Sequence, residues 1–159
     1  MIKVQSSFES DLQKKIVNAF EIFDQDGTRT VDIREIGTIM RSLGCCLSEA
    51  DLQDILVELE DEDSPGYVNL ETFLPMMTKF LLDQRFHPAS SNKLLQAFQM
   101  FDADKKGYLT QAELTHFLTQ DGECFTQDEM EEMLSAAVDP QSGHINYKEY
   151  VSHLVSENL

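Results

Sequence analysis

The sequence predicts an all-α fold of four helix–loop–helix units in two lobes, with short β contacts between paired loops. Two observations carry this prediction. The segment DQDGTRTVDIRE at residues 24–35 places oxygen-bearing side chains at alternate positions of a twelve-residue loop. Loops of related pattern then open at Asp61, Asp102 and Asp139, and a spacing near 40 residues is typical of repeated supersecondary units. Because the loops are even in number, two lobes of two units are expected.

Apolar residues at helical spacing flank the loops and predict the helices. The stripes around the first loop are Leu12, Ile16, Ala19, Phe20 and Phe23 before it, and Ile36, Ile39, Met40 and Leu43 after it. Ser48 and Thr126 begin capping patterns that predict two further helix starts. Each loop also keeps one apolar residue at position 8 or its equivalent, where a strand contact would join the loops in pairs. These residues are Val31, Val68, Leu109 and Ile145.

The first loop has the ligand pattern of a calcium site, since calcium takes six to eight oxygens from alternate positions of such a loop. The predicted ligands are Asp24, Asp26 and Thr28 at positions 1, 3 and 5, the Thr30 backbone carbonyl at position 7, Asp32 through a water at position 9, and bidentate Glu35 at position 12. Position 6, which normally takes glycine, is Arg29. A left-handed conformation costs such a residue about 1–2 kcal/mol, so we expect weak binding, or binding only in context.

The second and fourth loops lack ligands that calcium needs. In residues 61–72, Pro65 stands at position 5, and Thr72 at position 12 has no carboxylate. The fourth loop runs from Asp139 to Glu149, which is one residue too short to keep the ligands in phase. His144 within it is expected to be an exposed loop residue and not a ligand.

The third loop, residues 102–113, keeps its acidic positions but carries Lys106 at position 5. An ammonium at a ligand position opposes a divalent cation. We expect Lys106 to pair with Asp102 or Asp104, so that an internal salt bridge stands in for the metal. The sequence therefore predicts calcium at the first loop only.

The net charge of the sequence indicates which classes of partner it can bind. The net charge is −17, and both halves are acidic, which disfavours nucleic acid and anionic membranes and favours a basic helix. The predicted organisation is a lobe at residues 1–82, a linker at 83–91 and a lobe at 92–159. The three cysteines lack the spacing of a metal site, so we expect free thiols. The sequence has no signal-peptide or membrane-spanning pattern, and we therefore expect a cytoplasmic protein.

The loops resemble those of the calmodulin, centrin and light-chain family of EF-hand proteins. A narrower resemblance rests on VDIREIGTIMRSLGCC, GYVNLETFLPMMTKFLLDQRFHP and MEEMLSAAVDPQSGHINYKEY. These segments are similar to the dynein regulatory complex protein 8 family, including the Cys45–Cys46 doublet and the shortened fourth loop. The resemblance implies a subunit of the nexin–dynein regulatory complex in the axoneme of cilia and flagella, a cytoskeletal assembly, bound to helical segments of other subunits.

Three hypotheses follow for function. The first is a non-enzymatic structural and regulatory subunit that clasps a partner helix with or without calcium. The second is a calcium sensor in which residues 24–35 tune that grip. The third, a soluble calcium buffer, fits less well because three loops are impaired. An enzyme is not expected, since the sequence has no phosphate-binding glycine loop, no HExxH and no nucleophile with a histidine partner. The methionines would either line partner grooves or fill cores, because both uses share helical spacing.

Overall fold

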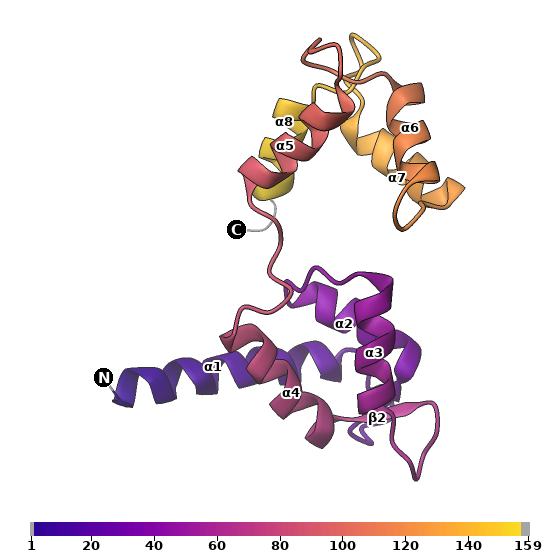
Figure 1. The fold of residues 1–159 in the computed structure, drawn as a ribbon. Helices are drawn as coiled ribbons and strands as arrows, with labels where there is room; N and C mark the ends of the chain where they lie inside the picture. The colour runs from indigo at the N-terminus through magenta and orange to yellow at the C-terminus, as the bar shows by residue number, and fades with distance from the viewer. Residues whose placement is uncertain (1, 157–159) are drawn as a thin grey trace. The chain divides into compact units, whose positions relative to one another are not determined.

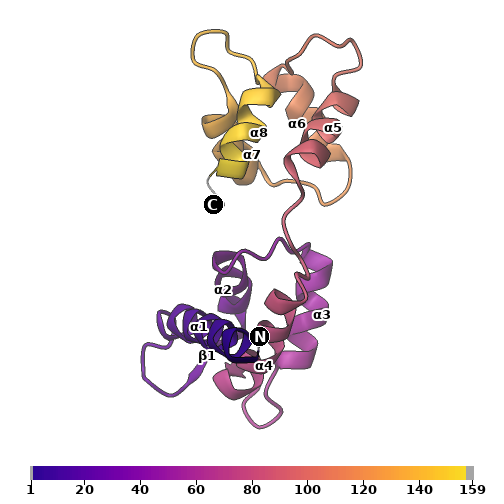
Figure 2. The same ribbon diagram turned by 90° about the vertical axis from the view of Figure 1, so that its left-hand side faces the viewer.

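The computed structural model describes residues 2–156, which form two compact units that meet along the chain between Pro88 and Ala89 (Figure 1). The elements of the first unit are α1 (Ile2–Glu21), β1 (Thr30–Asp32), the 3-10 helix η1 (Ile33–Glu35), α2 (Ile36–Ser42), α3 (Glu49–Leu59), β2 (Tyr67–Asn69) and α4 (Leu70–Leu82). Those of the second are α5 (Ser91–Phe101), α6 (Gln111–Gln120), α7 (Gln127–Ala137) and α8 (Tyr147–Ser156). Each unit contains two helix–loop–helix hands whose loops lie together, as predicted (Figure 2).

The paired loops are joined by antiparallel backbone contacts. In the first unit, β1 pairs with β2 and Val31 lies opposite Val68. In the second, Leu109 and Ile145 form a single bridge, with N–H···O distances of 3.0 Å and 2.8 Å in the two directions. All four side chains are buried. The structure thus confirms the predicted role of the apolar residue at position 8.

Helices α1 and α4 pack side by side in the core of the first unit, to which α2 and α3 also contribute buried side chains. The Phe20 and Phe73 rings lie 5.6 Å apart between centroids, and both side chains are buried. Ile16 of α1 and Met77 of α4 belong to the same buried cluster. These residues sit on the apolar stripes of the sequence, because one face of each helix turns toward the other.

The core of the second unit is smaller and is built around α5 and α8. Phe98 of α5 stacks on Tyr147 of α8 with the ring planes within 1° of parallel. Helix α7 begins with the predicted capping box, in which the Thr126 hydroxyl and the Glu129 carboxylate each accept the other's backbone N–H. Helix α6 begins with a second capping box, from Thr110 and Glu113.

The methionines differ in their burial. Met40, Met77 and Met130 are buried, whereas Met100 is 82 % exposed. In the described part of the chain, no helix combines the length and the apolar character needed to cross a membrane.

Residues 83–88, within the segment expected to be a linker, fold back on the first unit. The Cys46 N–H donates to the Phe86 carbonyl at 2.7 Å, and the Phe86 ring meets Phe80 edge to face at 5.4 Å. The Arg85 guanidinium lies over both rings, 4.9 Å and 4.8 Å from their centroids. Helix α5 then begins after Ser90, whose hydroxyl caps it.

We predict that Phe73→Ala destabilises the first unit by about 3–5 kcal/mol, because it removes a buried ring and leaves a cavity beside Phe20. The measurement is urea unfolding followed by NMR resonances of the first unit. Phe8→Ala is the control, since Phe8 is 62 % exposed and its loss should cost less than about 0.5 kcal/mol. Equal effects of the two substitutions would contradict this assignment of the core.

Candidate metal centre

The first loop is turned by the carboxylate of Asp24. Its Oδ1 accepts the Thr28 N–H at 3.1 Å, and its Oδ2 accepts the Arg29 N–H at 2.8 Å. Thr28 and Thr30 share a hydrogen bond of 2.8 Å between their hydroxyls. These contacts curl the chain so that loop positions 1, 5 and 7 come together.

Arg29 adopts the left-handed backbone conformation that the loop requires at position 6, with a φ of 62°. A side chain with a Cβ is strained there by about 1–2 kcal/mol, while glycine is not. The hydrogen bond from the Arg29 N–H to Asp24 holds this turn in place. The defect predicted from the sequence is therefore a real backbone feature of the loop.

Asp32 faces a cation of its own chain. The Arg34 side chain donates from Nε to Oδ1 at 3.0 Å and from Nη2 to Oδ2 at 2.7 Å, and the Arg34 backbone N–H donates to Oδ1 at 2.9 Å. These hydrogen bonds, first from the side chain and then from the backbone, lower the pKa of Asp32 to about 2. Calcium at this loop would have to share Asp32 with Arg34.

The structure brings only part of the predicted ligand set together. Asp24, Thr28 and Thr30 are linked as described, whereas Glu35 makes no side-chain hydrogen bond to the start of α2. Over residues 2–156, no three His, Cys, Asp or Glu side chains gather as a metal site would require. The donor types nevertheless fit a hard divalent cation. Asp24, Asp26, Thr28, the Thr30 carbonyl, Asp32 and Glu35 are the residues that would hold calcium.

The second loop is turned differently. Asp61 Oδ1 accepts the Asp63 N–H, and the Gly66 N–H donates to Glu60 at 2.9 Å instead of to Asp61. The position 1 carboxylate therefore does not organise the turn at position 6. This arrangement accompanies the missing carboxylate at position 12.

The fourth loop closes on itself within its short span. Asp139 accepts the Gln141 N–H at 3.0 Å and the Ser142 hydroxyl at 3.2 Å. His144 is partly buried, and its ring stacks on Tyr108 of the third loop with centroids 4.5 Å apart. The expectation of an exposed His144 is therefore wrong, because the paired loops bring an aromatic ring against it.

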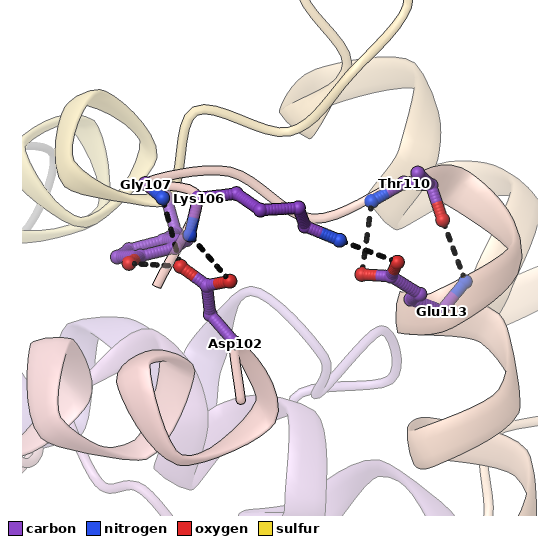
Figure 3. A network of polar contacts seen from close by, with 6 residues as sticks. Asp102, Lys106, Gly107, Thr110 and Glu113 are labelled. Atoms are coloured by element: carbon purple, nitrogen blue, oxygen red, sulfur yellow. Dashed lines mark hydrogen bonds and ion pairs between the residues drawn. The ribbon is translucent and has the colours of Figure 1, made fainter. Parts of the chain in front are cut away.

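The third loop is organised around Asp102, which is only 3 % exposed. Its Oδ1 accepts the Lys106 N–H at 3.0 Å, and its Oδ2 accepts the Gly107 N–H and the Tyr147 hydroxyl, both at 2.8 Å (Figure 3). Burial alone would raise the pKa of Asp102, but the hydrogen bonds from Gly107, Tyr147 and Lys106 outweigh it and lower the pKa. Burial and the bond to Asp102 raise the pKa of Tyr147.

Sequence reasoning missed Tyr147. It lies 45 residues from Asp102 in the chain, at the first residue of α8, so no local pattern links the two residues. Its ring packs on Phe98, and this stacking aims the hydroxyl at the carboxylate. The only signal in the sequence was a tyrosine in a core position, since a buried tyrosine hydroxyl usually has a hydrogen-bond partner.

The Lys106 ammonium reaches across the third loop to Glu113, with Nζ to Oε1 at 2.6 Å (Figure 3). An internal salt bridge forms, as expected, but the expected partners Asp102 and Asp104 are wrong. Asp102 is turned toward the loop amides and Tyr147, so the flexible lysine extends to position 12 instead. The hydrogen bond raises the pKa of Lys106 and lowers that of Glu113.

Comparisons with known proteins bear on the whole chain. A family model described as an EF-hand domain pair matches residues 13–78 and residues 91–154. A protein of Mus musculus named dynein regulatory complex protein 8 is 51 % identical over 146 residues, which cover 92 % of this chain and 89 % of that protein. The Homo sapiens protein of the same name is 45 % identical over 117 residues, which cover 74 % of this chain and 44 % of the human protein.

Two solved structures have the same fold. The myosin II regulatory domain of Physarum polycephalum matches with a TM-score of 0.72 and 31 % identity, over 91 % of this chain and 94 % of the other. Mlc1p bound to IQ2 of Myo2p, a class V myosin, matches with a TM-score of 0.67 and 26 % identity, over 87 % of this chain and 95 % of the other. These similarities confirm the predicted all-α, calmodulin-like fold class.

We predict that Arg29→Gly tightens calcium binding at the first loop several-fold. The change removes both the backbone strain at φ 62° and a cation near the ligands. Calorimetric titration of the full chain is the measurement. Arg29→Lys keeps the strain and the charge and should leave the affinity unchanged. Glu35→Gln in the Arg29→Gly background should abolish the site, and survival of the site in that double variant would contradict the ligand assignment.

We predict a pH dependence for the Lys106–Glu113 pair. The folded-state pKa of Glu113 is lowered from 4.5, so its contribution is complete above that value and is lost as pH falls through the lowered value. The pKa of Lys106 is raised from 10.5, so its contribution is complete below that value and is lost as pH rises through the raised value. The pair should therefore stabilise the second unit between these limits.

Urea midpoints of the second unit, measured at several pH values from neutral to below 4.5, test this window. Lys106→Met should flatten the loss of stability on the acid side, because the lysine no longer lowers the pKa of Glu113. Lys105→Met removes a neighbouring charge and should leave the acid slope close to that of the parent. Identical acid slopes for all three proteins would show that the pair contributes nothing.

Proposed function

The chain belongs to the EF-hand family, and from this premise we propose that it is a non-enzymatic subunit of the dynein regulatory complex that clasps a helical segment of a neighbouring subunit. In this role it resides in the axoneme of cilia and flagella and helps to regulate their motility. Its grip does not depend on calcium.

One observation carries the proposal. The identity of 51 % with a protein named dynein regulatory complex protein 8 extends over both units and 92 % of the chain. A relative that shared only one EF-hand pair would indicate a common module. Similarity across both units, at this identity, favours a common assembly.

The mode of partner binding draws on the solved structures. Mlc1p is described as bound to IQ2 of a class V myosin, and its chain matches 87 % of this one. The net charge of −17 favours a basic partner, as it attracts opposite charge and repels acidic surfaces. A basic amphipathic helix has both the charge and the apolar face that a light-chain-like unit takes.

Several large apolar side chains remain exposed in the free chain. Met100 is 82 % exposed in the second unit, and Val57 and Ile22 are 79 % and 75 % exposed in the first. Single exposed apolar residues are ordinary on protein surfaces. They therefore add no site by themselves, and the proposal rests on the similarities and the charge.

A calcium sensor is the second candidate, and the first loop favours it. Asp24 already turns the loop, and the residue types at the remaining ligand positions suit calcium. In a sensor, ion binding would change the helix packing of the first unit and so the grip on the partner. The strained Arg29 and the Asp32–Arg34 pair both oppose tight binding at this loop.

We predict that the full chain binds a basic amphipathic helical peptide in excess EGTA, and that saturating calcium changes the affinity by less than about tenfold, equivalent to about 1.4 kcal/mol. Fluorescence anisotropy with a labelled peptide is the measurement. A peptide of identical composition, rearranged so that no helical face is apolar, is the control and should bind much more weakly.

The outcomes separate the candidates. Binding in EGTA supports the calcium-independent subunit. Binding only in calcium assigns the chain to the sensors. Equal binding of both peptides would show charge attraction without a clasp, and absence of binding in either condition would contradict helix capture.

A further inference from the structure

We propose that the third loop carries a resident cation of its own, the Lys106 ammonium, in the place where a loop of this type holds calcium. The second unit is then independent of calcium, and any calcium response of the chain arises in the first unit. This inference depends on the chemistry of residues 102–113 and not on the identity of a partner.

Lys106 and Glu113 stand at positions 5 and 12 of the third loop. In a calcium loop, positions 5 and 12 both face the ion, so the ion lies between them. Here these two side chains meet directly, with Nζ and Oε1 separated by 2.6 Å (Figure 3). An ammonium that bridges position 5 to position 12 leaves no room between them for a second cation and repels one that approaches.

The Glu113 carboxylate is already engaged by contacts within the chain. Calcium takes both carboxylate oxygens at position 12. Oε1 of Glu113 accepts from Lys106, and Oε2 faces the Thr110 N–H at 3.5 Å in the capping box of α6. Both oxygens therefore have partners within the chain, and the same residue is the third of helix α6 and forms the capping box with Thr110.

Asp102 also supports the proposal. Its Oδ2 accepts two hydrogen bonds, one of them from the Tyr147 hydroxyl of the neighbouring hand. The Lys106 ammonium meanwhile lies over the Tyr108 ring, with Nζ 5.3 Å from the ring centroid. The carboxylate at position 1 and the ammonium at position 5 of the third loop are therefore both held by contacts within the chain.

The first loop shows what the third would be without its lysine. Position 5 there is Thr28, a neutral oxygen donor, and the ion pair of that loop joins Asp32 to Arg34 two residues away. No cationic side chain of the first loop is held across it from position 5 to position 12. The remaining ligand positions of the third loop keep suitable residues, including Asp104 and Glu113, and position 6 is the usual glycine, Gly107. A single residue therefore separates this loop from a complete calcium pattern.

Lys106→Asp is the direct test, made in the full chain. Calorimetric titration with calcium alone should show one more site than in the parent, and NMR should show a calcium-dependent shift of the Gly107 amide. Lys105→Asp is the matched control, since it changes the net charge equally at the adjacent position and should add no site. Glu113→Gln in the Lys106→Asp background should remove the added site.

Three results would overturn the proposal. A parent protein that loses a calcium site on Glu113→Gln would show that its third loop already binds the ion. A folded Lys106→Asp protein that gains no site would show that the lysine is not what excludes calcium. A Lys106→Met protein whose second unit melts in EGTA at the same temperature as Lys105→Met would show that the ammonium holds nothing in place, whereas we expect a lower melting temperature for Lys106→Met.

Discussion

Each unit depends on a short antiparallel contact that ties its two loops back to back. In the first unit Val31 and Val68 lie opposite each other, and in the second Leu109 and Ile145 do. These contacts are made by backbone groups and buried apolar side chains, so they need no ion. They hold the two loops of each unit together, and the helices on either side share one core.

The first and third loops have the most complete acidic patterns, and different contacts stabilise them. In the first, Asp24 curls the chain and leaves a ligand set that suits calcium, at the expense of a strained Arg29. In the third, Asp102 makes the same turn. Lys106 supplies the positive charge that an ion would otherwise provide, and the Tyr147 hydroxyl donates a hydrogen bond to Asp102. One chain therefore combines a loop whose donor types suit calcium with a loop in which an internal ion pair joins positions 5 and 12.

Much of this was accessible from the sequence, because loop chemistry and helix caps are local. The capping box at Thr126 joins two residues that lie three apart in the chain. The apolar residue at position 8 could be located from the loop repeat, although its contact joins distant residues such as Val31 and Val68. The partner of Lys106 was mispredicted because it depends on where Asp102 points. That direction is set by Tyr147, 45 residues away, whose ring is positioned by packing. The return of residues 83–88 onto the first unit rests on the apolar Phe86, whose ring packs against Phe80.

The central claim is that packing and internal contacts, without ions, maintain the shape of the second unit. Amide hydrogen exchange of Leu109 and Ile145, measured by NMR on the full chain in EGTA and in saturating calcium, tests it most directly, because both N–H groups form the bridge between the loops. We expect strong and equal protection in both conditions. Loss of protection at these two amides in EGTA, with recovery in calcium, would contradict the claim.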